Sequence, residues 1–97
     1  MTGNRAAGNA RQGVTFVPDA QGLAISGRSE RIDFGRSPRG VIPIMDREVG
    51  NRQELGVAGC PAGVVRQVAW GDLVLTFGRE RFVGWKKGSE QSGSVCA

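Results

Sequence analysis

The stretch from Val64 to Trp85, VVRQVAWGDLVLTFGRERFVGW, constrains the fold more than any other part of this chain. Two apolar runs flank Gly71-Asp72, and a two-residue loop that begins with glycine favours a type II′ hairpin turn, because glycine accepts a positive φ there. The register that follows pairs Trp70 with Leu73, Val68 with Leu75 and Arg66 with Phe77. The stretch therefore predicts a meander of three short antiparallel strands in the C-terminal half.

The two faces of this meander differ in polarity. Side chains alternate across a sheet, so one face carries large apolar groups and the other is mixed. The apolar face holds Val68, Trp70, Leu73, Leu75 and Phe77, and the other holds Val65, Gln67, Ala69, Val74 and Thr76. This pattern is typical of a sheet that is covered on one side only.

The second turn, from Gly78 to Arg81, places Phe82 opposite Phe77. Strict alternation then puts Gly84 on the apolar face, where a strand glycine often marks close approach by another backbone, here that of the helix. The same alternation turns Trp85 outward. The outward set is Trp85, Val83 and Val74, ringed by Arg79 and Arg81. It is either a contact surface for a partner or a patch that the N-terminal half covers.

The rest of the chain predicts three short strands and one helix. The strand candidates are residues 14–17, 23–25 and 31–34. Ser37 is a good N-cap with Pro38 as the first helical residue, and Gly50 suits the C-terminal cap, so the helix covers about 37–49. Pro43 is expected to kink this helix or delay its start. Residues 50–63 contain four glycines and a proline and are expected to form a loop.

These elements predict an α+β fold, with a single helix packed on an antiparallel sheet of five or six strands. The expected organisation is a flexible tail at 1–13, one domain at 14–87 and a second flexible tail at 88–97. The predicted core consists of Ile32, Phe34, Val41, Ile44, Met45, Val68, Trp70, Leu75, Phe77 and Phe82.

The formal net charge is +4, with thirteen basic and nine acidic residues. Basic proteins attract phosphate backbones and acidic surfaces. The arginines are nevertheless dispersed, and they do not alternate with aromatic residues as in RNA-binding motifs. Arg66 is unusual because it lies on the apolar face. It either extends its guanidinium to the sheet edge or lines a pocket for an anion.

Catalytic motifs are absent from the sequence. There is no histidine, which excludes histidine-based triads, and no GxGxxG, P-loop or GxSxG motif. A carboxylate pair, with Asp33 and Glu48 as the best candidates, is the remaining enzymatic possibility. The sequence therefore predicts a protein that is not an enzyme and that uses no cofactor or metal.

Cys60 and Cys96 do not have zinc-site spacing, and they either form a disulfide or remain one buried thiol and one terminal thiol. The sequence lacks an apolar run long enough to span a membrane. Its first residues, MTGNRAAGNARQG, lack the apolar region of a signal peptide. The expected location is therefore the cytoplasm.

The motif Ile32-Asp33-Phe34-Gly35 before a helix that ends at Gly50, together with Trp70-Gly71-Asp72-Leu73 and Phe82-Val83-Gly84-Trp85, resembles a group of small bacterial domains from high-GC organisms. The resemblance covers about residues 22–87. It implies a fold of this kind and a binding role, with no catalytic residue to carry over. Members of the group are usually exported, whereas this chain shows no export signal.

The function predicted from the sequence is a non-enzymatic binding module that self-associates as a homo-oligomer through the surface around Trp85. The alternative is a basic accessory protein that binds nucleic acid.

Overall fold

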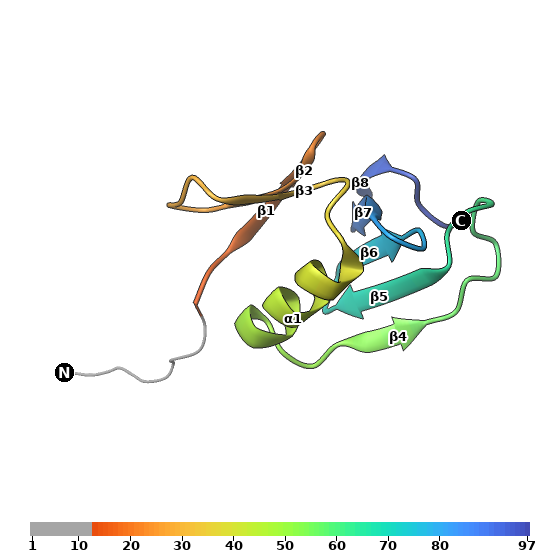
Figure 1. The fold of residues 1–97 in the computed structure, drawn as a ribbon, viewed down its shortest axis with the longest axis horizontal. Coiled ribbons are helices and arrows are strands. Elements are labelled where there is room, and N and C mark those ends of the chain that lie inside the picture. Colours follow the sequence, from red (N-terminus) through yellow and green to blue (C-terminus); the bar gives the residue numbers. More distant parts are fainter. Residues whose placement is uncertain (1–12) are drawn as a thin grey trace.

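The computed structural model describes residues 13–97, which form one helix and eight strands in two antiparallel sheets (Figure 1). This is the predicted α+β fold with a single helix packed on sheet. The elements in chain order are β1 (Phe16–Asp19), β2 (Gly22–Ile25), β3 (Arg31–Asp33), α1 (Pro38–Glu48), β4 (Gln53–Leu55), β5 (Arg66–Trp70), β6 (Leu73–Phe77), β7 (Phe82–Lys87) and β8 (Glu90–Gly93). The tail predicted at 1–13 lies outside the described residues except for Gly13.

The smaller sheet has the order β1-β2-β3 and is built from two successive hairpins. Leu23 pairs with Ile32 across β2 and β3, and both side chains are buried. On the other face, Arg31 lies between Asp19 and Asp33 and forms ion pairs with both carboxylates. The alternation in these strands therefore turns one apolar face towards the rest of the protein.

The larger sheet has the order β4-β5-β6-β7-β8, so the predicted three-strand meander is its centre. The predicted register between β5 and β6 is confirmed from Arg66–Phe77 to Trp70–Leu73. Gly71 has φ +63°, as its turn requires. The sequence did not predict the outer strands. β4 lies in the segment 50–63 that was expected to be a loop, and β8 lies in the segment 88–97 that was expected to be a flexible tail. Their sequences, QEL and EQSG, have no alternating apolar pattern, and their strand geometry comes from pairing with β5 and β7.

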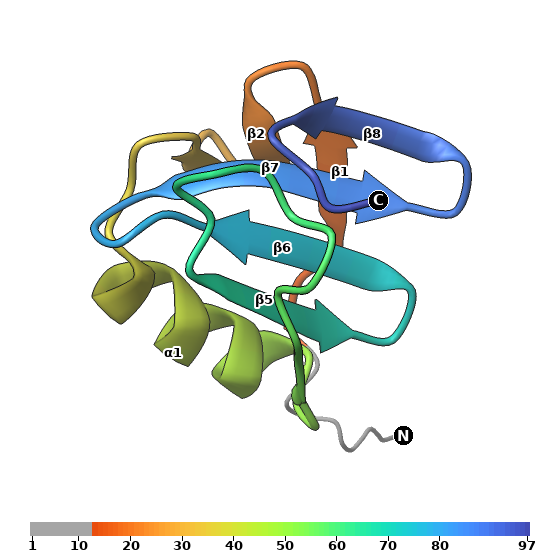
Figure 2. The same cartoon turned by 90° about the vertical axis from the view of Figure 1, so that its right-hand side faces the viewer.

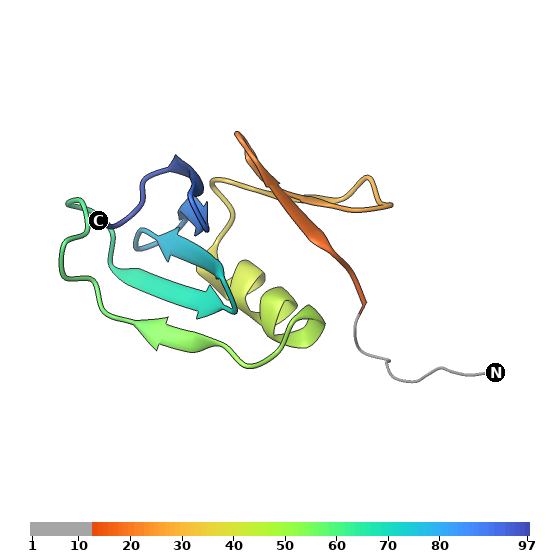
Figure 3. The ribbon, with the colours of Figure 1, turned by 180° about the vertical axis from the view of Figure 1, so that it is seen from behind.

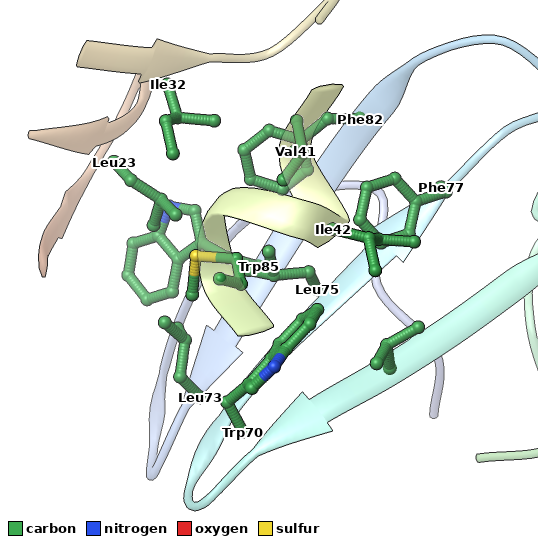
Figure 4. Close-up of a cluster of buried hydrophobic side chains, with 12 residues drawn as sticks. Leu23, Ile32, Val41, Ile42, Trp70, Leu73, Leu75, Phe77, Phe82 and Trp85 are labelled. Carbon is green, nitrogen blue, oxygen red and sulfur yellow. The ribbon is translucent and has the colours of Figure 1, made fainter. Parts of the chain in front are cut away.

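The orientation predicted for Trp85 is wrong, and a β-bulge is the reason. Phe82 lies opposite Phe77 as expected, but the register then shifts, so that Thr76 faces Gly84 and Leu75 faces Trp85. One extra residue on β7 reverses the side to which every later side chain points. Trp85 is therefore only 4% exposed and shares the core with Trp70 (Figure 4).

Helix α1 begins and ends close to the predicted residues. Ser37 caps it by accepting a hydrogen bond from the Arg39 amide, and Gly50 follows the last turn with φ +82°. Pro43 lies inside the helix without ending it. The apolar stripe of the helix buries Val41, Ile42 and Met45 against the larger sheet.

One core is shared by the helix and both sheets (Figure 4). Its buried members are Leu23, Ile32, Val41, Ile42, Met45, Val68, Trp70, Leu73, Leu75, Phe77, Phe82 and Trp85. Of the predicted core residues, Phe34 and Ile44 are only partly buried, and they pack against the cluster. The Trp85 indole Nε1 donates a 2.7 Å hydrogen bond to the Asp19 carbonyl, which joins the smaller sheet to the larger one.

The opposite face of the larger sheet is covered by chain segments rather than by a second layer of helix. Cys60 and Cys96 form a disulfide, which links the β4–β5 loop to the C-terminal segment (Figure 2). The Thr76 hydroxyl donates to the Ser94 carbonyl, and the Ala97 amide donates to the Gly59 carbonyl. The C-terminus consequently lies beside that loop (Figure 3). This cover leaves Ala69 and Thr76 buried.

Candidate functional site

A cavity of about 560 Å³ opens where the first turn of α1 meets the start of β5 and the β6–β7 turn. These three segments lie at one end of the larger sheet (Figure 2). We call this cavity the arginine groove. Its lining residues are Ser37, Pro38, Arg39, Val65, Arg66, Phe77, Gly78, Arg79 and Glu80.

Backbone hydrogen bonds hold the two walls of the groove in place. The Gly35 amide donates to the Phe82 carbonyl at 2.8 Å, and the Phe82 amide donates to the Arg36 carbonyl at the same distance. Across the β6–β7 turn, the Gly78 amide donates to the Arg81 carbonyl. The start of the helix and the turn are therefore fixed against each other, although more than forty residues of sequence separate them.

The amides of the first helical turn are already occupied. The Arg39 amide donates to the Ser37 hydroxyl, and the Gly40 and Val41 amides donate to the Ser37 carbonyl. A helix N-terminus attracts anions mainly through free amides. The chemistry of this groove therefore depends on its side chains and not on the helix end.

Arginine side chains dominate the charge of the groove. Arg39 and Arg79 line it, and Arg81 follows in the same turn; all three are exposed. Within residues 13–97 none of these three forms an ion pair, whereas Arg31, Arg47, Arg52 and Arg66 all do. Glu80 is the acidic member of the lining. The groove is thus lined by two arginines that form no ion pair among the described residues.

Arg66 lies at the rim of the groove and belongs to a network of ion pairs. Its guanidinium forms two hydrogen bonds with the Glu54 carboxylate on β4. Glu54 also pairs with Arg52, which in turn pairs with Asp46. The hydrogen bond from Arg66 holds the pKa of Glu54 below its ordinary value. Arg66 therefore reaches the edge strand β4, where two of its N–H groups bond to Glu54, and it also lines the groove.

The groove also has an apolar side. Of its apolar lining residues, Val65 is 53% exposed, Pro38 is half-buried and Phe77 is fully buried. A ligand that fills the groove would cover the Val65 side chain, which water now contacts.

The predicted contact surface is not assembled as expected. Trp85 is buried on the helix face, so it cannot centre an exposed patch. Val74 and Val83 are half-buried, and Val74 pairs with Lys86 and Ala69 on the other face of the sheet. Only Arg79 and Arg81 are exposed as predicted. The structure instead joins Arg79 and Arg66 with Arg39 and Val65, which the sequence did not single out.

The two carboxylates considered for catalysis occupy different elements and have separate partners. Asp33 on β3 accepts from Arg31, and Glu48 at the end of α1 accepts from Arg47. Within residues 13–97 no group of three or more side chains is arranged to hold a metal ion.

Comparison with known proteins gives no relative for this chain: no family model, curated protein or solved structure matches it. The one helix among the described residues is too short to cross a membrane.

Proposed function

We propose that this protein is a non-enzymatic binding module that takes an anionic partner in the arginine groove. The observation that carries the proposal is that Arg39 and Arg79, which form no ion pair among the described residues, line one cavity. Guanidinium groups bind carboxylates and phosphates through paired hydrogen bonds that are stronger than those between neutral groups.

The surroundings of the groove support this proposal. The backbone bonds between residues 35–36 and Phe82 fix the positions of its walls before a ligand arrives. A preformed site binds with a smaller loss of conformational entropy than one that must order on binding. The volume of about 560 Å³ also lies within the range of ordinary ligand sites.

The test is a titration with hexaglutamate and with inorganic phosphate, followed by NMR of the backbone amides. Shifts are expected at residues 37–39 and 78–81. Replacing Arg39 and Arg79 together by glutamine should weaken hexaglutamate binding by roughly a hundredfold or more, because each lost charged hydrogen bond contributes about 1.5–3 kcal/mol.

The matched control replaces Arg28 and Arg47 by glutamine, which removes the same charge at exposed positions outside the groove. This control should lose little affinity. If both double variants lose affinity equally, binding reflects net charge alone and the groove is not the site.

From the disulfide we propose that this protein resides in an oxidising compartment, and not in the cytoplasm that the sequence predicts. Disulfides persist in oxidising compartments and are rare in the cytosol. A bridge between Cys60 and Cys96 that ties down the cover of a sheet is of structural use only where it stays oxidised. Rapid alkylation of the protein in its native compartment, followed by mass spectrometry, should find neither cysteine alkylated, because both are in the disulfide. Alkylated cysteines would contradict residence in an oxidising compartment.

A further inference from the structure

We infer that the partner of the arginine groove is an acidic polypeptide segment that carries an apolar side chain between its carboxylates. This inference rests on the proposed function and deepens it. It is carried by the combination of unpaired guanidinium groups and an exposed apolar side chain in one cavity.

The apolar side of the groove is the first argument. Val65 is 53% exposed, and it lines the groove together with Pro38 and the buried Phe77. A purely ionic ligand would leave this surface in water. An apolar side chain placed there removes it from water, which is favourable in proportion to the area covered.

The second argument concerns the charge pattern. Glu80 lines the groove, and in the sequence it stands between Arg79 and Arg81. The groove therefore carries a negative group among its positive ones. A phosphate backbone carries charge at every step and would meet this carboxylate. A peptide can place its carboxylates against Arg39 and Arg79 and a neutral side chain elsewhere.

The third argument is the burial of the aromatic residues. Proteins that bind single-stranded nucleic acid stack bases on exposed aromatic rings. All six aromatic side chains lie within residues 13–97: Phe77, Phe82, Trp70 and Trp85 are buried, and Phe16 and Phe34 are half-buried against the core. Phe77, which is buried, is the aromatic residue in the lining of the groove. The groove therefore offers charge and an aliphatic contact but no stacking platform.

The experiment compares three probes of similar charge at equal salt concentration by calorimetry. One is a peptide in which leucine is flanked on each side by two acidic residues, the second replaces the leucine by serine, and the third is a single-stranded oligothymidylate with as many phosphates as the peptide has carboxylates. The leucine peptide should bind best, about fivefold more tightly than the serine peptide, because it covers Val65.

The variant Val65→Ser should remove the difference between the two peptides without abolishing binding. Val57→Ser is the control, since Val57 is also exposed, at 42%, and lies outside the groove. Circular dichroism of each variant confirms that it is folded before the comparison.

The outcomes separate the inference from the proposed function. Equal binding of the two peptides, or tighter binding of the oligothymidylate, overturns the inference and leaves an anion site at Arg39 and Arg79. Failure of all three probes overturns both.

Discussion

Gly84 and Gly93 show how single residues set the packing of the C-terminal strands. A Cβ atom built on Gly84 would lie 2.1 Å from the Ser94 carbonyl oxygen, and one on Gly93 would lie 2.3 Å from the Val83 carbonyl oxygen. The close approach predicted at Gly84 is therefore present, but the neighbouring backbone is that of the C-terminal segment and not that of the helix.

Gly84→Ala is expected to lower the free energy of unfolding by about 1–3 kcal/mol or more, because backbone atoms cannot move aside as a flexible side chain can. Gly40→Ala is the matched control. Gly40 lies inside α1 with no atom within 4 Å of a built Cβ, so alanine there should raise stability by about 0.5–1 kcal/mol. Urea denaturation measures both variants, and equal effects of the two would contradict the close packing of Ser94 on β7.

Trp85 provides a second test at the residue scale. Trp85→Phe removes the indole donor and leaves the Asp19 carbonyl without its 2.7 Å partner. The expected loss of stability is about 1–3 kcal/mol, because a partly buried acceptor then lacks this donor. Sedimentation velocity should show no change in molecular size, because the side chain lies in the core. A change in oligomeric state without a loss of stability would instead place Trp85 in an interface.

Among the elements, β4 is held to the sheet edge by charge as well as by backbone pairing. Glu54 on β4 bonds to Arg66 on β5, and Arg52 joins Glu54 to Asp46 on α1. Trp70 also donates to Asp46, so this network ties the helix to the sheet. On the smaller sheet, the hydrogen bond from Arg31 lowers the pKa of Asp19.

Acid should weaken these connections. The folded pKa values of Glu54 and Asp19 lie below their ordinary values, so the unfolded chain binds protons first as the pH falls. The stabilisation is therefore complete at neutral pH and is lost progressively below about pH 4.

The urea concentration at the midpoint of unfolding is expected to fall as the pH is lowered from 7 to 3. Glu54→Gln should show a smaller fall than the unmodified protein, because it has already lost the titrating carboxylate. Glu30→Gln, at an exposed position with no ion pair among the described residues, should behave like the unmodified protein. If the urea midpoint of Glu54→Gln falls as much as that of the unmodified protein, the Glu54–Arg66 pair does not contribute to the loss of stability in acid.

Local sequence patterns predicted two elements correctly, the central hairpin and the helix. The hairpin of β5 and β6 follows from a glycine-led turn between alternating apolar residues, and α1 follows from Ser37, Pro38 and Gly50. Both patterns depend on a few neighbouring residues, so the hairpin and the helix form whatever the rest of the chain packs against them. The strands β4 and β8 carry no such signal, because a polar segment becomes a strand only when a neighbour supplies its hydrogen bonds.

For the whole molecule, the Cys60–Cys96 bridge closes a loop with a sequence separation of 36 residues around the larger sheet. A loop of this length contributes about 4 kcal/mol in the chain-entropy account of disulfides. The bridge also secures the segments that cover Ala69 and Thr76.

Replacing both cysteines by serine is expected to lower the melting temperature by roughly 15–30 °C, because 1 kcal/mol corresponds to about 4–8 °C in a domain of this size. Differential scanning calorimetry of the double variant, with the unmodified protein in the presence and absence of a dithiol reductant, tests this. A melting temperature unaffected by both treatments would contradict a structural role for the bridge.

The arginine groove could not have been predicted as a unit. The sequence indicated Arg66 because it lies on an apolar face, and it indicated Arg79 only as part of the rim of the surface around Trp85. Arg39 and Val65 carry no local signal, since an exposed arginine in a helix and a valine before a strand are ordinary. Only the hydrogen bonds between Phe82 and the segment before α1 bring these residues to one cavity.

By itself, the sequence determined the α+β class, the helix, the first three strands and the register of the central hairpin, because alternation, caps and glycine turns act over a few residues. Tertiary structure decided the side to which Trp85 points, the two outer strands, the pairing of the cysteines and the groove. The physical reason is that one unpaired residue in a ladder reverses all later side chains, and the position of such a bulge depends on how the whole sheet packs against the helix and the smaller sheet.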